Sequence, residues 1–167
     1  MDMQDRADRI IELAREIAAA EPDFQLVRGA GAGDRATAIF LAALRTRVHT
    51  TLGIECWEKK ICGPTSYAVD FYLEEEGTVV EVALGLPNPS SEYEKDVLKA
   101  IIAQDYFPVR RLVLISRAGG EQKCRQPGRT AVREWARTKH GLTIDVFDLG
   151  GVPRRRKRTG RTERPER

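Results

Sequence analysis

Two carboxylates stand among apolar residues on neighbouring strand candidates: Asp70 within "YAVDFYL" and Glu81 within "TVVEVAL". The segment that separates them, "EEEG", predicts a hairpin connection. Counting outward from that turn places Asp70 directly opposite Glu81. Like charges in this arrangement repel, and a buried carboxylate without a partner destabilises the fold or shifts its pKa. We therefore expect a cation between the two acids, and carboxylate oxygens are ligands that Mg²⁺ prefers.

Each acid taken alone has a simpler explanation. Either side chain could reach solvent, or it could pair with an arginine such as Arg45 or Arg111. The register also depends on the turn, because a connection shorter by one residue would put Asp70 and Glu81 on opposite faces of the sheet. Both alternatives stay open at the level of sequence.

Helices and strands must surround this hairpin to position the acids. Apolar spacing predicts a first helix that ends at Pro22 and a second from about Asp34, its N-cap, to Leu52, followed by Gly53. Further helices are expected over about residues 91–106 and in "GRTAVREWARTKHG". Additional strands are expected in "IECWEKKI", "VRRLVLIS" and "LTIDVFDL". The order α-α-β-β-β-α-β-α-β predicts an α/β domain whose mixed sheet has helices on both faces.

A glycine-rich segment precedes the second helix, with Gly29, Gly31 and Gly33 in "RGAGAGD". Such a turn could place a phosphate at a helix N-terminus, which leaves a nucleotide-binding protein as a minor alternative. The spacing is G-x-G-x-G and not G-x-G-x-x-G, so we favour a flexible joint. The chain then divides into residues 1–33, a helix and its Gly-rich connection; residues 34–152, the α/β domain; and residues 153–167, a tail.

The order helix, three-strand meander, helix, strand, with "VDFYL" and "VEVAL" around the hairpin, resembles the core of the PD-(D/E)xK nuclease superfamily, the restriction-endonuclease-like fold. The resemblance covers roughly residues 34–149. It implies that Asp70 and Glu81 bind Mg²⁺ or Mn²⁺, and that a lysine two residues after the glutamate assists the attacking water. Ala83 stands at that lysine position, and Val69 stands where the superfamily often has proline.

Another lysine must then supply the missing charge, and some members of the superfamily carry a catalytic residue on the helix that follows the hairpin. The inward stripe of that helix is predicted to consist of four apolar residues, Val97, Leu98, Ile101 and Ile102. A helical wheel through this stripe places Lys95 and Lys99 toward its edge. We prefer Lys95 as the catalytic lysine, with Lys99, and Lys59 or Lys60 on the first strand, as the other candidates.

The same wheel places Glu94 on the inward side, which makes it a candidate third metal ligand. Glu94 also completes a capping box with Ser91, and that role alone would explain it. Glu92 and Asp96 suit a helix N-terminus whatever the function.

Basic charge is concentrated in the tail. Residues 153–167 carry a net charge of +6 against +3 for the whole chain, so the preceding residues are mildly acidic. The tail should be disordered and should attract the phosphates of nucleic acid without sequence preference; a terminus that only aids solubility is the alternative. The candidate nucleic-acid-binding residues are Arg154, Arg155, Arg156, Lys157 and Arg158.

The sequence as a whole predicts a metal-dependent endonuclease that hydrolyses phosphodiester bonds. Its catalytic residues would be Asp70, Glu81 and Lys95, and its metal ligands Asp70, Glu81 and Glu94. We expect nucleic acid as the partner, with DNA preferred over RNA, and we leave a homodimer open. Without a long apolar run or a signal-peptide pattern, the cytoplasm is the expected location. A non-catalytic nucleic-acid-binding or scaffold module of the same fold is the alternative.

Overall fold

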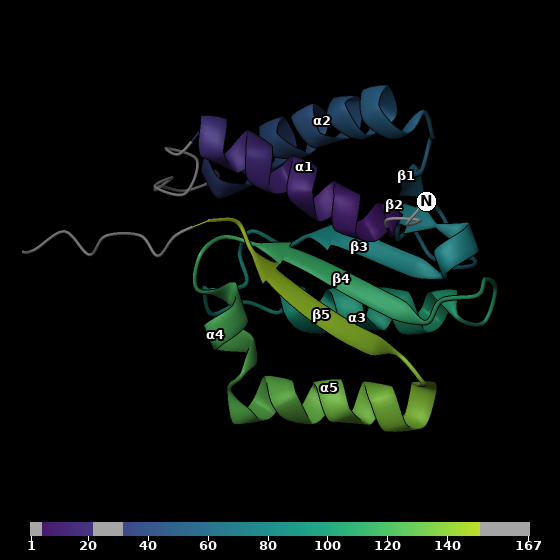
Figure 1. Cartoon of the computed structure of the whole chain (residues 1–167). Helices are drawn as coiled ribbons and strands as arrows, with labels where there is room; N and C mark the ends of the chain where they lie inside the picture. The colour runs from purple at the N-terminus through teal and green to yellow at the C-terminus, as the bar shows by residue number, and fades with distance from the viewer. Residues whose placement is uncertain (1–4, 22–31, 151–167) are drawn as a thin grey trace, which may run out of the picture.

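The computed structural model describes residues 5–21 and 32–150. Its centre is a five-stranded sheet in which the strands lie in the order of the chain, β1-β2-β3-β4-β5 (Figure 1). The first three strands pair antiparallel, whereas β3, β4 and β5 are parallel. The mixed sheet of an α/β domain is therefore confirmed. The strands are β1 Trp57–Lys59, β2 Val69–Leu73, β3 Thr78–Val82, β4 Arg111–Ser116 and β5 Thr143–Asp148.

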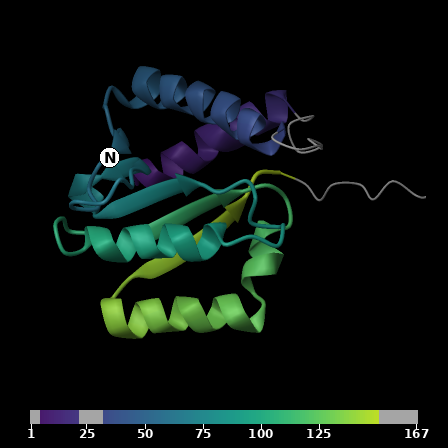
Figure 2. The same cartoon turned by 180° about the vertical axis from the view of Figure 1, so that it is seen from behind.

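Helices cover both faces of this sheet, as Figures 1 and 2 show. On one face lie α1 (Arg6–Ala20) and α2 (Ala32–Leu52); on the other lie α3 (Glu92–Ala103) and α5 (Pro127–His140). A short helix, α4 (Gly120–Cys124), precedes α5. The predicted order of elements is confirmed, with α4 and a 3₁₀ turn over Glu74–Glu76 as additions.

The boundaries of α2 test two predictions about its ends. The helix begins at Ala32, so the prediction that Asp34 is the N-cap is wrong. Asp34 lies instead within the first turn of the helix. The predicted end is confirmed, because Gly53 adopts a left-handed conformation (φ +64°) and its N–H donates to the carbonyl of His49 at 2.9 Å.

The β2–β3 hairpin has the predicted register. Leu73 pairs with Thr78 and Phe71 with Val80, so one further step brings Asp70 opposite Glu81. Gly77 closes the turn at φ +59°, and a Cβ there would meet the carbonyl oxygen of Pro108 at 2.9 Å. Only glycine fits this position without strain.

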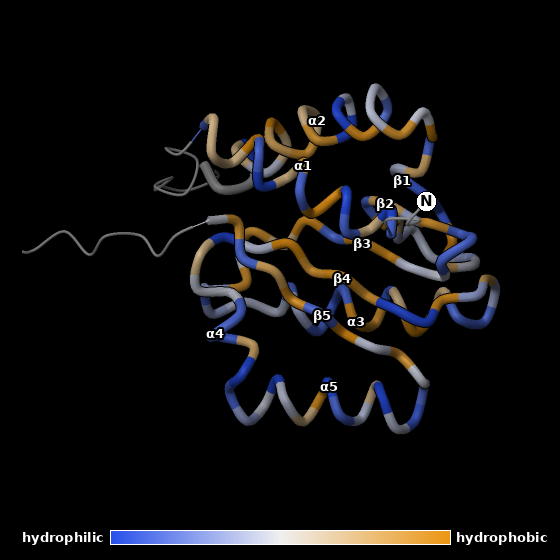
Figure 3. The backbone as a smooth tube through the Cα atoms, in the orientation of Figure 1, coloured by the Kyte–Doolittle hydropathy of each residue, from blue (hydrophilic) through white to orange (hydrophobic). Residues whose placement is uncertain are grey.

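Two apolar clusters hold the layers together, and hydrophobic residues are concentrated along β3 and β4 in the middle of the sheet (Figure 3). One cluster joins the sheet to α1 and α2, and it includes the fully buried Ile10 and Leu13 of α1. The helix that the sequence analysis set apart from the α/β domain thus shares its core. The other cluster joins the sheet to α3 and α5, and it includes Val79 and Ala83, the residues on the same face of β3 as Glu81.

Candidate active site

The carboxylates of Asp70 and Glu81 lie side by side where β2 begins and β3 ends. Each accepts a hydrogen bond from the backbone of the opposite strand. The N–H of Val82 donates to Asp70 Oδ2 at 2.8 Å, and the N–H of Asp70 donates to Glu81 Oε2 at 3.3 Å. The two acids therefore share one face of the hairpin, as its register predicted.

Neither arginine considered as a partner for these acids takes that place. Arg45 pairs with Glu58 at 2.8 Å on the other side of the sheet, where α2 lies. Arg111 pairs with Asp145 at 2.8 Å and with Asp5 at 2.9 Å. The cation beside Glu81 comes from α3 instead.

Lys99 provides that cation. Its Nζ lies 2.6 Å from Glu81 Oε1 and 3.2 Å from Asp96 Oδ1, one helical turn earlier on α3. All three residues are buried, with exposed fractions of 2% for Glu81, 6% for Asp96 and 7% for Lys99. Val97 and Ala100, their neighbours on α3, belong to the apolar cluster on this face of the sheet, and the low exposed fractions mean that these charges are largely removed from water.

Burial is the largest influence on the pKa values of Glu81, Asp96 and Lys99, and their mutual charges add to it or oppose it. Burial and the neighbouring charges of Asp96 and Asp70 raise the pKa of Glu81 well above its ordinary value. Burial raises the pKa of Asp96 to about 6, although Lys99 opposes the shift. Burial would lower the pKa of Lys99, but Glu81 and Asp96 together outweigh it and raise that pKa. Lys99 is therefore protonated at neutral pH and balances only one of the nearby carboxylates.

The structure corrects the predicted inward face of α3. Its buried residues include Asp96 and Lys99, whereas Leu98 is 48% exposed. Residues two positions apart in a helix point in directions about 200° apart. Because Asp96 faces the sheet, Glu94 faces solvent, and it is exposed. Asp96, and not Glu94, is the acid that α3 brings to the site.

Lys95 is also displaced from its predicted position. It is exposed, and its Nζ lies 5.9 Å from the centre of the Tyr67 ring. The lysine in contact with Glu81 is thus Lys99, which the sequence offered as a second choice. Ser91 does occupy the N-cap of α3, but its side chain makes no capping hydrogen bond, so the predicted capping box is wrong.

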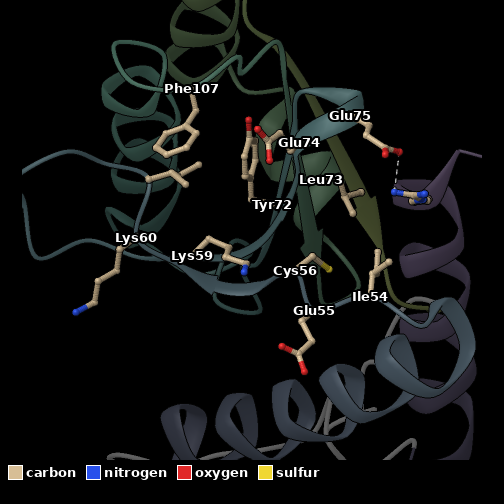
Figure 4. A pocket seen from close by; sticks show the side chains of 12 residues that line it. Ile54, Glu55, Cys56, Lys59, Lys60, Tyr72, Leu73, Glu74, Glu75 and Phe107 are labelled. Atoms are coloured by element: carbon tan, nitrogen blue, oxygen red, sulfur yellow. Dashed lines mark ion pairs between the residues drawn. The ribbon is translucent and has the colours of Figure 1, made fainter.

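Lys59 and Lys60 lie elsewhere, at the β1 edge of the sheet. Both line a separate cavity of about 460 Å³ together with Tyr72 and Phe107 (Figure 4). Both lysines are exposed, and the side chain of Lys60 points away from the cavity in this view. The structure does not bring either of them to Glu81.

No family model, curated protein or solved structure matches the chain. Within residues 5–21 and 32–150, no helix is long and apolar enough to cross a membrane. The five basic residues predicted to bind nucleic acid, Arg154 to Arg158, lie outside the described part of the chain, as do Gly29 and Gly31.

Proposed function

We propose that this protein is a metal-dependent nuclease of the PD-(D/E)xK kind, in which Lys99 replaces the lysine that is missing from the strand. One observation carries the proposal: two carboxylates on adjacent antiparallel strands, Asp70 and Glu81, meet a lysine ammonium 2.6 Å from Glu81. The described order of α2, the β1–β2–β3 meander, α3 and β4 is also the order of a restriction-endonuclease-like core. Ala83, at the usual lysine position, is fully buried and has no side-chain charge to offer.

The donor set suits a divalent cation. When ionised, Asp70, Glu81 and Asp96 carry three negative charges against the single ammonium of Lys99, so a doubly charged ion would balance the group. Among the described residues, no group of three or more His, Cys, Asp or Glu side chains is arranged to hold a metal ion. Asp70 and Glu81, which share one face of the hairpin, would supply the only protein ligands to Mg²⁺ or Mn²⁺ in this proposal, with water as the remaining ligands, which is common for Mg²⁺.

A bound ion of this type acidifies water and neutralises charge on the phosphodiester that is attacked. The protein side chains would position the attacking water and stabilise the charge that develops. Lys99 would place its ammonium beside the attacking water and stabilise negative charge on the phosphoryl oxygens. Asp96, at 3.2 Å, would hold Lys99 in that position. Asp70 and Glu81 are held in turn by their hydrogen bonds to the hairpin backbone.

A cleavage assay with three variants tests this proposal. We expect the wild-type protein to cut labelled DNA in Mg²⁺ or Mn²⁺ and not in EDTA, with RNA as the comparison substrate. Lys99→Met and Asp70→Asn should abolish cleavage under conditions in which circular dichroism shows each variant to be folded and nucleic-acid binding survives. Lys95→Met is the matched control, because Lys95 lies on the same helix but away from Glu81, and it should keep nearly full activity. Equal activities of the two lysine variants would contradict the role of Lys99.

The burial of the site favours one competing function, a nucleic-acid-binding module without catalysis. Glu81 is only 2% exposed and already has an ammonium beside it, so Lys99 could serve as a permanent counter-ion. A wild-type protein that binds DNA in a salt-dependent manner, yet neither cleaves it nor gains thermal stability from Mg²⁺, would establish this second function and end the first.

A further inference from the structure

A cavity of about 460 Å³, whose lining includes Lys59, Tyr72 and Phe107, lies at the β1 edge of the sheet (Figure 4). This β1-edge cavity has the volume of a small-molecule site, for which roughly 300–1,000 Å³ is common. It extends to Glu74, directly after β2, whereas Asp70 stands near the beginning of that strand. Four residues of a strand span roughly 13 Å, so a ligand in this cavity would leave the proposed active site free.

Aromatic and apolar side chains form walls of the β1-edge cavity. The rings of Tyr72 and Phe107 meet edge to face with their centres 5.8 Å apart, and the buried Ile61 and Leu73 line the same cavity. The Tyr72 hydroxyl donates to the carbonyl of Pro108 at 3.2 Å, and burial raises its pKa, so this wall is an uncharged ring whose donor is already used. Phe107 is 37% exposed, which leaves part of its ring open. Such walls suit a flat aromatic molecule.

Several charged residues also line the cavity, but four of them do not direct a free charge into it. Arg6 and Glu75 form an ion pair at 2.9 Å and so neutralise each other. The side chains of Glu55 and Lys60 point away from the cavity in Figure 4. These four residues therefore leave the charge inside the cavity nearly unchanged.

The two remaining charges, on Lys59 and Glu74, lie at opposite ends of the Tyr72 side chain. Figure 4 shows Lys59 extending its ammonium toward the backbone end of Tyr72, and Glu74 beside the hydroxyl end of the ring. Both side chains are exposed, and in the described part of the chain neither has an opposite charge within ion-pair distance. One end of the cavity therefore attracts a negative group, and the other end repels one.

We propose that the β1-edge cavity binds a small aromatic molecule with a single anionic group. The aromatic body of the ligand packs against Tyr72 and Phe107, and its anionic group pairs with Lys59. Glu74 discriminates against a second negative charge at the far end of the ligand. This inference does not depend on the proposed nuclease activity, because it uses none of the residues assigned to cleavage.

The test uses three naphthalene probes that differ only at the ends of the ring system. 2-Naphthoate has one carboxylate, naphthalene-2,6-dicarboxylate has one at each end, and 2-naphthylmethanol has none. Each is titrated into the ¹⁵N-labelled full chain, and the amide shifts of Lys59, Tyr72 and Leu73 report binding in the cavity. We expect 2-naphthoate to bind about fivefold more tightly than the alcohol, because a partly exposed ion pair contributes up to about that factor. The dicarboxylate should bind more weakly than 2-naphthoate.

Two variants and two matched controls assign the charges. Lys59→Met should remove the preference for 2-naphthoate over the alcohol and leave the affinity for the alcohol nearly unchanged. Lys60→Met, at the neighbouring lysine that points away, should keep the preference. Glu74→Gln should raise the affinity for the dicarboxylate to that for 2-naphthoate, whereas Glu55→Gln should not. All four residues are exposed, so each variant should keep the wild-type fold.

Equal affinity for the three probes would overturn the proposal, as would amide shifts confined to residues outside the cavity. A preference for 2-naphthoate that survived in Lys59→Met would also overturn it, because the anion would then bind elsewhere, for example to the basic residues 153–167. Amide shifts that depend on protein concentration without any probe would show that a second copy of the chain fills the cavity instead. None of these outcomes bears on DNA cleavage, so the two proposals can fail separately.

Discussion

Replacing Lys99 by methionine should destabilise the fold strongly at neutral pH. Methionine fills much of the volume of the lysine stem, so the principal loss is the ammonium that lies 2.6 Å from Glu81 and 3.2 Å from Asp96. Both carboxylates would remain buried without a partner. Removing one member of a buried ion pair costs about 3–5 kcal/mol of unfolding free energy.

Protonation sets an upper limit to that cost and makes it depend on pH. A carboxylate without its partner can take up a proton, at about 1.4 kcal/mol for each pH unit above its ordinary pKa. From the ordinary values of 3.8 for Asp96 and 4.5 for Glu81, the limits at pH 7 are about 4 and about 3 kcal/mol. At pH 5 they fall to about 2 and about 1 kcal/mol. The destabilisation should therefore decrease by half or more between pH 7 and pH 5.

Urea unfolding followed by circular dichroism at both pH values measures this effect. Lys95→Met is the control, because an exposed lysine on the same helix should change the unfolding free energy by no more than about 0.5 kcal/mol. If Lys99→Met were as stable as Lys95→Met at pH 7, or if its loss of stability did not change with pH, the buried charge group would not exist as described.

Three further predictions concern the metal, the proton and the tail. Millimolar Mg²⁺ or Mn²⁺ should raise the melting temperature of the wild-type protein by stabilising the folded state, and Asp70→Asn should abolish the increase; an equal increase in the variant would place the ion elsewhere. The folded state binds the Asp96 proton more tightly (pKa about 6) than the unfolded state (3.8), so Asp96 should make the protein more stable as the pH falls from about 6 to about 4. Stability curves of wild type and Asp96→Asn should therefore differ in slope over this range, and parallel curves would contradict the shift. Deleting residues 153–167 should lower the slope of log affinity against log salt for DNA while leaving the melting temperature nearly unchanged, and a large drop in that temperature would make the tail part of the fold.

The hairpin and the pair of acids could be predicted from sequence because both depend on local rules. The length of "EEEG" and the period of a strand are enough to set Asp70 opposite Glu81. The order of helices and strands followed in the same way from apolar spacing and from glycine and proline stops.

The partner of Glu81 could not be predicted, because it depends on how α3 rotates against the sheet. A stripe chosen from apolar residues alone included Leu98 and excluded Lys99, whereas the structure buries Lys99 and exposes Leu98. A charged residue faces the core when another element supplies a counter-charge, and that depends on tertiary structure. The i, i+3 spacing of Asp96 and Lys99 was the one available signal.

The hydrogen bonds from the hairpin backbone to Asp70 and Glu81 make the proposed active site part of the sheet's own framework. The amide protons of Asp70 and Val82 should therefore exchange slowly with deuterium, and their protection should report directly on the state of the two carboxylates. Alanine at position 70 would remove both the carboxylate charge and the acceptor for the Val82 N–H. The proposed cleavage activity and the stability of the hairpin would then be lost in the same variant. Asparagine keeps an oxygen that can accept the same hydrogen bond. Slow hydrogen exchange at Val82 would therefore mark a site that is inactive but intact, and fast exchange would mark a hairpin that has opened.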